Sequence, residues 1–185
     1  MEHLKFENTP LEGLKIVHKS KLGDERGHLS RMFCDSELKQ IGWNNNITQI
    51  NHTLTRKAGT VRGLHFQKVP HAEIKIVTCL RGKVFDVAVD LRPHSSTYLQ
   101  WQSCELSAEN WKSFYIPEGF AHGFQTISDD VEMLYFHSTS YAPDYEDGIH
   151  PQDKALAVSW PLAITELSDR DQSLGSVDKF VSLNH

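Results

Sequence analysis

Long apolar segments are missing from this sequence of 185 residues. No stretch approaches the roughly eighteen apolar residues that a membrane-spanning helix needs. The first ten residues, MEHLKFENTP, have neither the basic region nor the apolar region of a secretory signal. Positive charge is also scarce, because 19 lysines and arginines stand against 24 aspartates and glutamates and give a net charge of −5. We therefore expect a cytoplasmic protein that binds neither a membrane nor a nucleic acid.

Cysteine is equally scarce. The three cysteines, Cys34, Cys79 and Cys104, are widely spaced and form no CxxC motif. Such cysteines argue against a disulfide scaffold and against a zinc site built on thiolates, so we expect buried, reduced thiols. The sequence also has no low-complexity tract, no linker rich in proline, glycine or serine, and no internal repeat. Its length and composition predict one domain, residues 1–185.

Short strand-like runs separated by turns fill most of the sequence. The clearest is Val84–Leu91, where apolar residues at odd positions alternate with Asp86, Ala88 and Asp90 on the other face. The further runs with strand character are Ile16–Lys19, Leu29–Cys34, Ile47–Thr53, Val61–Gln67, Ile74–Leu80, Tyr98–Leu106, Ser113–Ile116, His122–Ile127 and Val131–Phe136. Many short strands at regular spacing predict an all-β antiparallel sandwich or barrel.

Helical signals are few. One short helix is predicted over Asp35–Gly42, with Asp35 or Ser36 as its N-cap, and a turn is predicted after Ser168. Tight turns are predicted at Gly23–Gly27 and between the strands on either side of Gly82. Helices are therefore expected only at the periphery of the sheets.

The segment RGLHFQ, which begins at Arg62, is the first group of residues that suggests chemistry. In a strand, His65 and Gln67 point to the same face, beside a glycine that leaves room for a ligand. Lys75 lies on the next predicted strand, within reach of the same space. For a histidine taken alone, this pattern favours a core residue that is hydrogen-bonded to its neighbours.

The segment IPEGFAHGF is the second such group. Its spacing Pro-x-Gly-x-x-His, which ends at His122, resembles the second motif of cupins. The first cupin motif normally supplies His-x-His, but here Gln67 replaces the second histidine. Metal sites usually need at least three good protein ligands, and His65 with His122, helped by Gln67 or Glu73, falls short. We expect no metal.

Other polar residues are ambiguous in the sequence alone. Tyr135 lies in a predicted strand and fits either a packing role or a proton donor. The charged segment Ser168–Asp171 reads from its spacing as a solvated turn. Asp86 and Asp90 share a strand face and fit either a catalytic pair or a solvated surface.

Taken together, the motifs resemble those of the dTDP-4-dehydrorhamnose 3,5-epimerase family. The resemblance runs from about Gly13 to Asp171 in the family's order. Its motifs are GDERG, VRGLHFQ, GKVFDVAVDLR, LSAEN, YIPEGFAHGF, LY, YAPDYE, WP and LSDRD. It implies a cupin-type jelly roll with short peripheral helices, a homodimer, and a cofactor-independent isomerase that acts on a nucleotide-linked 4-keto-6-deoxyhexose.

The resemblance also implies a role for individual residues. His65 corresponds to the general base, Tyr135 to the proton donor, and Asp171 to the carboxylate that orients the histidine. Lys75 corresponds to the cation beside the 4-keto oxygen, and Tyr141 to the residue that stacks on the nucleobase. The other residues at substrate-binding positions are Arg26, Gln49, Asn51, Arg62, His122, Glu146 and Arg170.

The sequence departs from the family pattern at three places. Arg31 stands where a glutamate is usual, and Ile50 stands where an aspartate is usual between Gln49 and Asn51. Ile74 precedes the lysine where glycine is usual. Because the first two positions are nucleotide-contacting in the family, we expect an altered base pocket beside an intact catalytic set.

Three alternatives stay open. One is an epimerase that inverts only C3 or only C5, on a dTDP-, CDP- or GDP-linked 4-keto sugar. Another is a metal-dependent cupin such as a dioxygenase, which would need His65, His122 and a third ligand around a metal. The last is a nucleotide-sugar-binding protein without catalysis. The sequence leaves the sugar, the product stereochemistry and the pathway undetermined.

Overall fold

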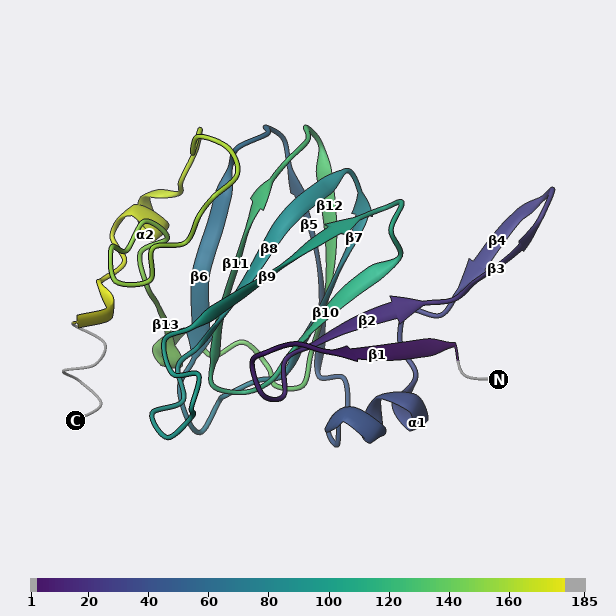
Figure 1. Ribbon diagram of the computed structural model, residues 1–185, viewed down its shortest axis with the longest axis horizontal. Helices are drawn as coiled ribbons and strands as arrows, with labels where there is room; N and C mark the ends of the chain where they lie inside the picture. Colours follow the sequence, from purple (N-terminus) through teal and green to yellow (C-terminus); the bar gives the residue numbers. More distant parts are fainter. Residues whose placement is uncertain (1–2, 179–185) are drawn as a thin grey trace.

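Two antiparallel sheets form the body of the protein in the computed structural model, which describes residues 3–178 (Figure 1). The ends of the predicted domain, residues 1–2 and 179–185, lie outside the described residues. One sheet has the order β1 (Leu4–Asn8), β2 (Lys15–Lys19), β10 (Lys112–Ile116), β7 (Lys75–Arg81), β12 (Val131–His137) and β5 (Gln49–Thr55). The other has the order β13 (Glu146–Gly148), β6 (Val61–Gln67), β11 (Phe120–Thr126), β8 (Lys83–Asp90) and β9 (Trp101–Ser107).

Strands that are distant in sequence are neighbours in both sheets, as when β2 pairs with β10 and β6 pairs with β11. This connectivity is that of a jelly roll, so the predicted all-β, cupin-type fold is confirmed. None of the helices in the described part of the chain is long and apolar enough to cross a membrane.

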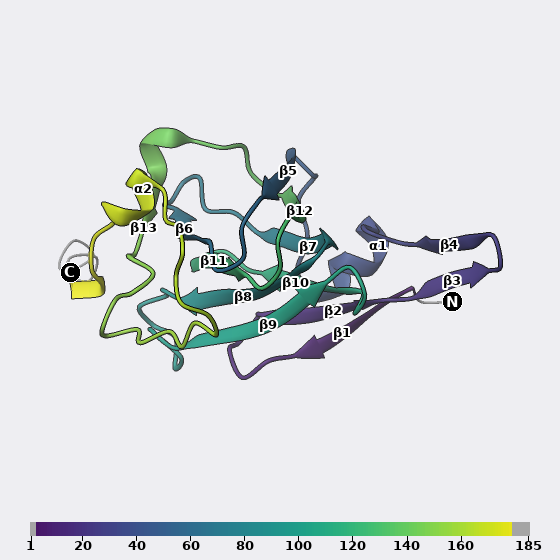
Figure 2. The same ribbon diagram turned by 90° about the horizontal axis from the view of Figure 1, so that it is seen from above.

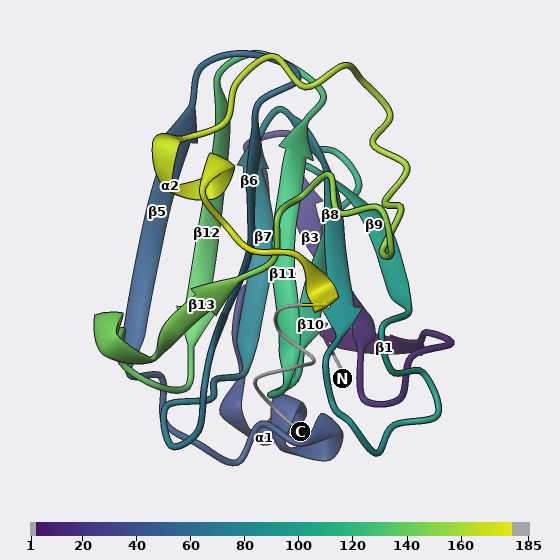
Figure 3. The ribbon, with the colours of Figure 1, turned by 90° about the vertical axis from the view of Figure 1, so that its left-hand side faces the viewer.

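The core between the sheets explains which face of β8 points inward. Val84 and Ala88 pack there with Phe114 of β10 and Met133 of β12. The odd-numbered apolar residues of β8 instead face outward, where Leu156 and other residues of the carboxy-terminal segment cover them. Figure 3 shows this segment running across the five-stranded sheet. The predicted alternation is therefore right, and the face that carries the two aspartates lies inside the protein.

The outer face of the six-stranded sheet is covered by α1 (Asp35–Leu38) and the 3-10 helix η1 (Lys39–Ile41). The predicted single helix is thus two shorter ones, and Gly42, at φ +102°, ends them. The N-cap is Cys34, so both predicted caps are wrong. Trp43, which follows the helices, is fully buried against Phe136 and other side chains of the sheet.

Most predicted strands are found with shifts of one to three residues at their ends, and β6 has the predicted bounds. The predicted strand Leu29–Cys34 is wrong, because the chain leaves the strand conformation after Ser30. The short strands β1, β3 (Lys21–Asp24) and β13 are not among the predicted strands. β3 and β13 lack an apolar alternation, whereas β1 has a short one, in which Leu4 and Phe6 alternate with Lys5 and Glu7. Two further short helices, η2 (Pro143–Tyr145) and α2 (Asp169–Gln172), lie beyond β12, and α2 begins at the predicted turn after Ser168.

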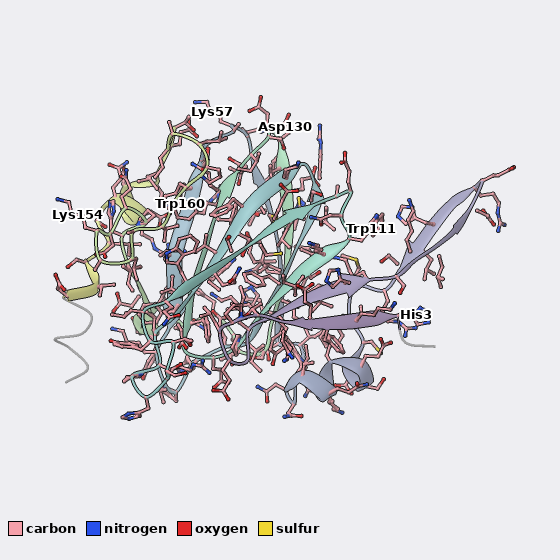
Figure 4. The ribbon with its side chains drawn as sticks, in the orientation of Figure 1. His3, Lys57, Trp111, Asp130, Lys154 and Trp160 are labelled. Atoms are coloured by element: carbon pink, nitrogen blue, oxygen red, sulfur yellow. The ribbon has the colours of Figure 1, made fainter. Side chains whose placement is uncertain are left out.

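The hairpin formed by β3 and β4 (Gly27–Ser30) projects away from the two sheets (Figures 1 and 2). Trp111, which is labelled in Figure 4, packs against the hairpin. The His28 ring meets the Trp111 ring edge-on at a centroid distance of 4.5 Å, and the Lys21 ammonium lies 5.3 Å from the same ring. Trp111 thus contacts both strands of the hairpin, while the turn between them extends outward.

Candidate active site

A cavity of about 470 Å³ opens between the two sheets. Strand pairing brings its polar residues together, because His65 of β6 pairs with His122 of β11, and Tyr135 of β12 pairs with Asn51 of β5. Every predicted site residue except Arg26 lines this cavity. The full set of lining residues is Gln49, Asn51, Thr53, Arg62, His65, Phe66, Gln67, Glu73, Lys75, His122, Phe124, Tyr135, His137, Tyr141, Glu146, Ser168, Arg170 and Asp171.

A histidine–carboxylate pair occupies one wall of the cavity. His65 Nε2 lies 2.6 Å from Asp171 Oδ1, while Asp171 Oδ2 accepts a hydrogen bond of 3.2 Å from the backbone N–H of Gly63. The Ser168 hydroxyl caps α2 by accepting from the Asp171 N–H and fixes the position of the carboxylate. Asp171 is 3% exposed, so the prediction of a solvated turn is wrong for this residue.

The charge state of the pair follows from its surroundings. Burial raises the pKa of Asp171, but the hydrogen bond and charge of His65 outweigh burial and hold the pKa below its ordinary value. An ionised carboxylate accepts the proton on Nε2 and leaves Nδ1 of His65 as the basic nitrogen. The geometry therefore suits a general base.

Tyr135 is buried in the same cavity. Burial raises its pKa far above the ordinary value for a phenol, so the hydroxyl keeps its proton at neutral pH. Its ring lies near two histidines, with a centroid distance of 6.4 Å to His122 and 6.1 Å to His137. A protonated phenol in this position can act as a proton donor.

The ammonium of Lys75 is held by Glu73, whose Oε1 lies 3.0 Å from Nζ. The other oxygen of Glu73 lies 2.7 Å from Nδ1 of His137. The predicted site residues do not include His137, and Glu73 is among them only as a weak metal ligand. The sequence holds a signal for His137, because it follows Tyr135 by two residues in a strand and so shares its face.

Asp86 and Asp90 do not form a pair, and neither is solvated. Asp86 is fully buried, and its Oδ1 lies 2.8 Å from Nε2 of His122. Burial raises the pKa of the Asp86 carboxyl. Its second oxygen, Oδ2, has no hydrogen-bond partner among the residues that the structure describes. Asp90 instead binds the guanidinium of Arg92, with 2.7 Å between Oδ2 and Nη2. Both predicted alternatives for these aspartates are wrong.

The family model of dTDP-4-dehydrorhamnose 3,5-epimerase matches residues 8–179 of the chain. The chain belongs to this family. A dTDP-4-dehydrorhamnose 3,5-epimerase from Sinorhizobium fredii is 38% identical over 178 residues, which cover 96% of this chain and 91% of the relative. A dTDP-4-dehydrorhamnose 3-epimerase from Streptomyces niveus is 40% identical over 163 residues, which cover 88% of this chain and 78% of the relative.

A solved structure has nearly the same fold. It is a dTDP-6-deoxy-D-glucose-3,5-epimerase from Legionella pneumophila in complex with dTDP-4-keto-L-rhamnose. The two chains are 38% identical and superpose with a TM-score of 0.91 over 95% of this chain and 94% of the other. The resemblance found in the motifs is thereby confirmed for the family and for the fold.

At the mouth of the epimerase cavity, Tyr141 is half-exposed and its hydroxyl donates to Glu146 Oε2 at 2.6 Å. Arg170 reaches the other oxygen of Glu146 at 2.5 Å. Gln67 fixes the segment that carries Tyr141, since its Oε1 accepts from the Ala142 N–H at 2.6 Å. Gln67, which replaces the second cupin histidine, therefore positions the segment at the mouth of the cavity.

Three residues of the expected nucleotide site lie outside the cavity of this epimerase chain. Arg26 is in the projecting hairpin and binds Asp24 at 2.5 Å. Arg31 binds Glu37 at 2.7 Å. Ile50 points to the face of β5 opposite its neighbours Gln49 and Asn51. Arg31 and Ile50 therefore do not border the cavity of their own chain, and the expectation that they reshape the base pocket stays a prediction.

The histidines of the cavity do not converge on one point where they could bind a metal ion together. His65, His122 and His137 each contact a different carboxylate. Within residues 3–178, no group of three or more His, Cys, Asp or Glu side chains is placed to hold a metal ion.

Proposed function

We propose that this protein catalyses cofactor-independent epimerisation at C3 and C5 of a dTDP-linked 4-keto-6-deoxyhexose, in the synthesis of dTDP-rhamnose for a polysaccharide or glycoside. The observation that carries the proposal is that one cavity collects a base, a cation and an acid. These are the His65–Asp171 pair, Lys75 and the buried phenol of Tyr135. Family membership supports the same reaction.

The chemistry of a 4-ketone calls for these three groups, because the carbonyl acidifies the hydrogens on C3 and C5. Nδ1 of His65 takes the proton from carbon, and the electron pair moves onto the C4 oxygen as an enolate. The ammonium of Lys75 stabilises that negative charge. Tyr135 then gives its proton to the same carbon from the opposite face, which inverts the centre and re-forms the ketone. Solvent returns a proton to the phenolate and removes one from the imidazolium, and each positioned proton transfer contributes about 10²–10⁴-fold.

The remaining lining residues suit the nucleoside diphosphate. Arg62 and Arg170 carry planar guanidinium groups that pair with phosphate oxygens. Tyr141, at the mouth, offers an aromatic face for the nucleobase. The polar side chains left for the ribose and the sugar are Gln49, Asn51, His122 and Glu146.

We further propose that residues 1–185 form a single cytoplasmic domain that works as a homodimer in which Arg26 reaches the partner's cavity. Leu22 and Leu29 are exposed in the projecting hairpin, and Ile50 and Leu54 are exposed on β5, the edge strand of the sheet. An exposed edge strand with apolar neighbours is suited to pairing with a second copy.

Sedimentation velocity tests the dimer. The wild type should sediment as a dimer, and Leu29→Asp should sediment as a monomer with reduced turnover. Arg26→Ala should stay dimeric and raise KM for the nucleotide sugar. A fully active wild-type monomer would contradict both the dimer and the role of Arg26 in the partner's cavity.

The reaction itself is tested by incubating the protein with dTDP-4-keto-6-deoxyglucose in deuterated water and reading C3 and C5 by NMR. We expect deuterium and inversion at both carbons, and much slower turnover of the CDP- and GDP-linked sugars. Deuterium at one carbon would instead support the second candidate, a single-centre epimerase, which the similarity to the Streptomyces niveus 3-epimerase favours. Binding without any exchange would contradict catalysis.

A further inference from the structure

A continuous line of hydrogen bonds connects the cation of the active site with the aromatic residue at its mouth. It begins at Lys75, whose ammonium contacts Glu73 at 3.0 Å, and passes from Glu73 to Nδ1 of His137 at 2.7 Å. His137 Nε2 then lies 3.4 Å from Nδ2 of Asn51. The line goes on to Gln49 through Asn51 Oδ1, which accepts from Gln49 Nε2 at 3.1 Å.

Its last link is a backbone group. Oε1 of Gln49 accepts from the backbone N–H of Tyr141 at 3.0 Å. All the side chains in the line also border the cavity, so a bound substrate would lie along it.

The groups at the two ends of this line determine how the side chains between them orient their hydrogen-bond donors and acceptors. The backbone N–H of Tyr141 can only donate, so Gln49 must turn its carbonyl oxygen toward it and its NH₂ toward Asn51. Asn51 must then accept with its oxygen and donate with its NH₂ toward His137. His137 consequently accepts at Nε2 and carries its proton on Nδ1, which donates to Glu73.

Glu73 is suited to be the terminal acceptor. Burial raises its pKa, but the hydrogen bond from His137 and the charge of Lys75 outweigh burial and hold the pKa below its ordinary value. An ionised carboxylate has no proton to donate. The direction of donation from Tyr141 to Glu73 is therefore the single arrangement in which every link has one donor and one acceptor.

We propose that the Glu73–His137 pair is a positioning element that makes β5 present hydrogen-bond donors to the substrate. In this arrangement Asn51 and Gln49 each use one amide hydrogen within the line and keep the other for the cavity. The ligand atoms they suit are acceptor oxygens between the nucleobase and the reacting ketone, above all those of the diphosphate. This inference rests on the proposed function, because it names a determinant of substrate affinity at the same site.

His137 should affect the affinity for the substrate and not the rate of the chemical step. Without an acceptor at Nε2, the Asn51 amide can rotate and present its oxygen to the substrate, which repels a phosphate oxygen. Lys75 would still be held by Glu73, so the cation beside the ketone would stay in place. Loss of His137 should therefore weaken binding of ground state and transition state alike, which raises KM and leaves kcat nearly unchanged.

Two variants of His137 test this. His137→Asn keeps a donor at the reach of Nδ1 for Glu73 but has no acceptor for Asn51. His137→Gln places an amide oxygen at about the reach of Nε2. We expect His137→Asn to raise KM for dTDP-4-keto-6-deoxyglucose, and the calorimetric Kd for free dTDP, about 10-fold with kcat within twofold of wild type, and His137→Gln to recover most of the loss.

The matched control is His18→Gln. His18 lies in β2 of the same sheet and does not line the cavity, and its Nε2 lies 2.6 Å from Glu7 Oε2. Its replacement should change neither KM nor Kd. Circular dichroism and thermal melting establish that each variant is folded.

Unchanged KM and Kd in a folded His137→Asn, or a fall in kcat without a rise in KM, would overturn the inference. Equal loss in His137→Gln and His137→Asn would also overturn it, because the acceptor would then be irrelevant. If the wild type binds dTDP but does not epimerise the sugar, the proposed function fails, and the comparison of dTDP affinities still decides this inference.

Discussion

His65 and Asp171 are separated by 106 positions in the sequence, yet Nε2 of the histidine lies 2.6 Å from Oδ1 of the aspartate. The strand β6 supplies the histidine, and the first turn of α2 supplies the carboxylate. The same aspartate also accepts from the backbone of Gly63, so the contact ties α2 to the strand that carries the base.

Replacing the aspartate should therefore reduce the basicity of the histidine. In Asp171→Asn the side chain no longer carries charge and no longer enforces the tautomer with a free Nδ1, so kcat should fall about 10²–10⁴-fold. Asp169→Asn is the matched control, because Asp169 is exposed in the same helix. Steady-state kinetics compares the two, and equal activity of both variants would remove Asp171 from its proposed role.

Removing the acid and removing the base should have different consequences. Tyr135→Phe retains His65 and Lys75, so an enolate still forms and His65 returns deuterium to the original face. This variant should exchange hydrogen for deuterium while losing most inversion, whereas His65→Asn should lose both. NMR of the recovered sugar reads the two quantities separately, and full exchange by a folded His65→Asn would exclude that histidine as the base.

Chelation should leave turnover unchanged. Gln67, at the position of a cupin metal ligand, uses its oxygen on the Ala142 N–H and its NH₂ on the carbonyl oxygen of His71 at 3.1 Å. His65 and His122 each contact a carboxylate. Activity should therefore survive exhaustive treatment with EDTA, measured on protein whose metal content has been determined. Loss of turnover that one divalent ion restores would show a metal-dependent reaction.

Asp90 should contribute stability that depends on pH. Burial alone raises the pKa of this carboxyl, but hydrogen bonds from Arg92, Ser95 and Thr97 outweigh burial and lower the pKa to about 2, from 3.8. Because the folded-state pKa is the lower one, the contribution of about 2 kcal/mol is present above about pH 4 and is lost as the pH falls toward 2.

Asp90→Asn should accordingly lower the free energy of unfolding at pH 7 by about 2 kcal/mol or more and flatten its decline between pH 4 and pH 2. Asp144→Asn, at an exposed aspartate, serves as the control. Urea denaturation at several pH values measures both. A slope in acid that is the same in wild type and Asp90→Asn would refute the assignment.

Lys19 should make the stability of the folded protein rise with pH as well, in the alkaline range. It is 8% exposed, and burial lowers its pKa to about 8 from 10.5. Its ammonium donates to Ser113 Oγ at 2.7 Å, to the Lys112 carbonyl at 3.0 Å and to Thr78. Between pH 8 and 10.5 the unfolded chain binds more protons, so the stability of the folded protein should rise with pH by up to about 1.4 kcal/mol per unit.

Lys19→Met should abolish this rise, and Lys5→Met, at an exposed lysine on the neighbouring strand, should retain it. Chemical denaturation at pH 7, 8, 9 and 10 gives the slopes. A wild-type stability that does not increase over this range would contradict the assignment.

The sequence by itself determined the features that depend on neighbouring residues. Alternation along Val84–Leu91 predicted a strand with two distinct faces, and Gly82 predicted the turn before it. His65 and Gln67 face the cavity together because side chains two residues apart in a strand share a side. The motifs around them are specific enough to identify the family from the amino-acid sequence alone.

The tertiary structure alone decided which of these faces and charges meet. The aspartate face of β8 points inward because the carboxy-terminal segment covers its apolar face. Asp171 is buried because α2 packs on β6, although the charged residues around it read as a solvated turn. Glu73 meets His137 only through the pairing of β7 with β12. Such contacts depend on the register between strands and on the path of long connections, and neither is encoded in the spacing of nearby residues.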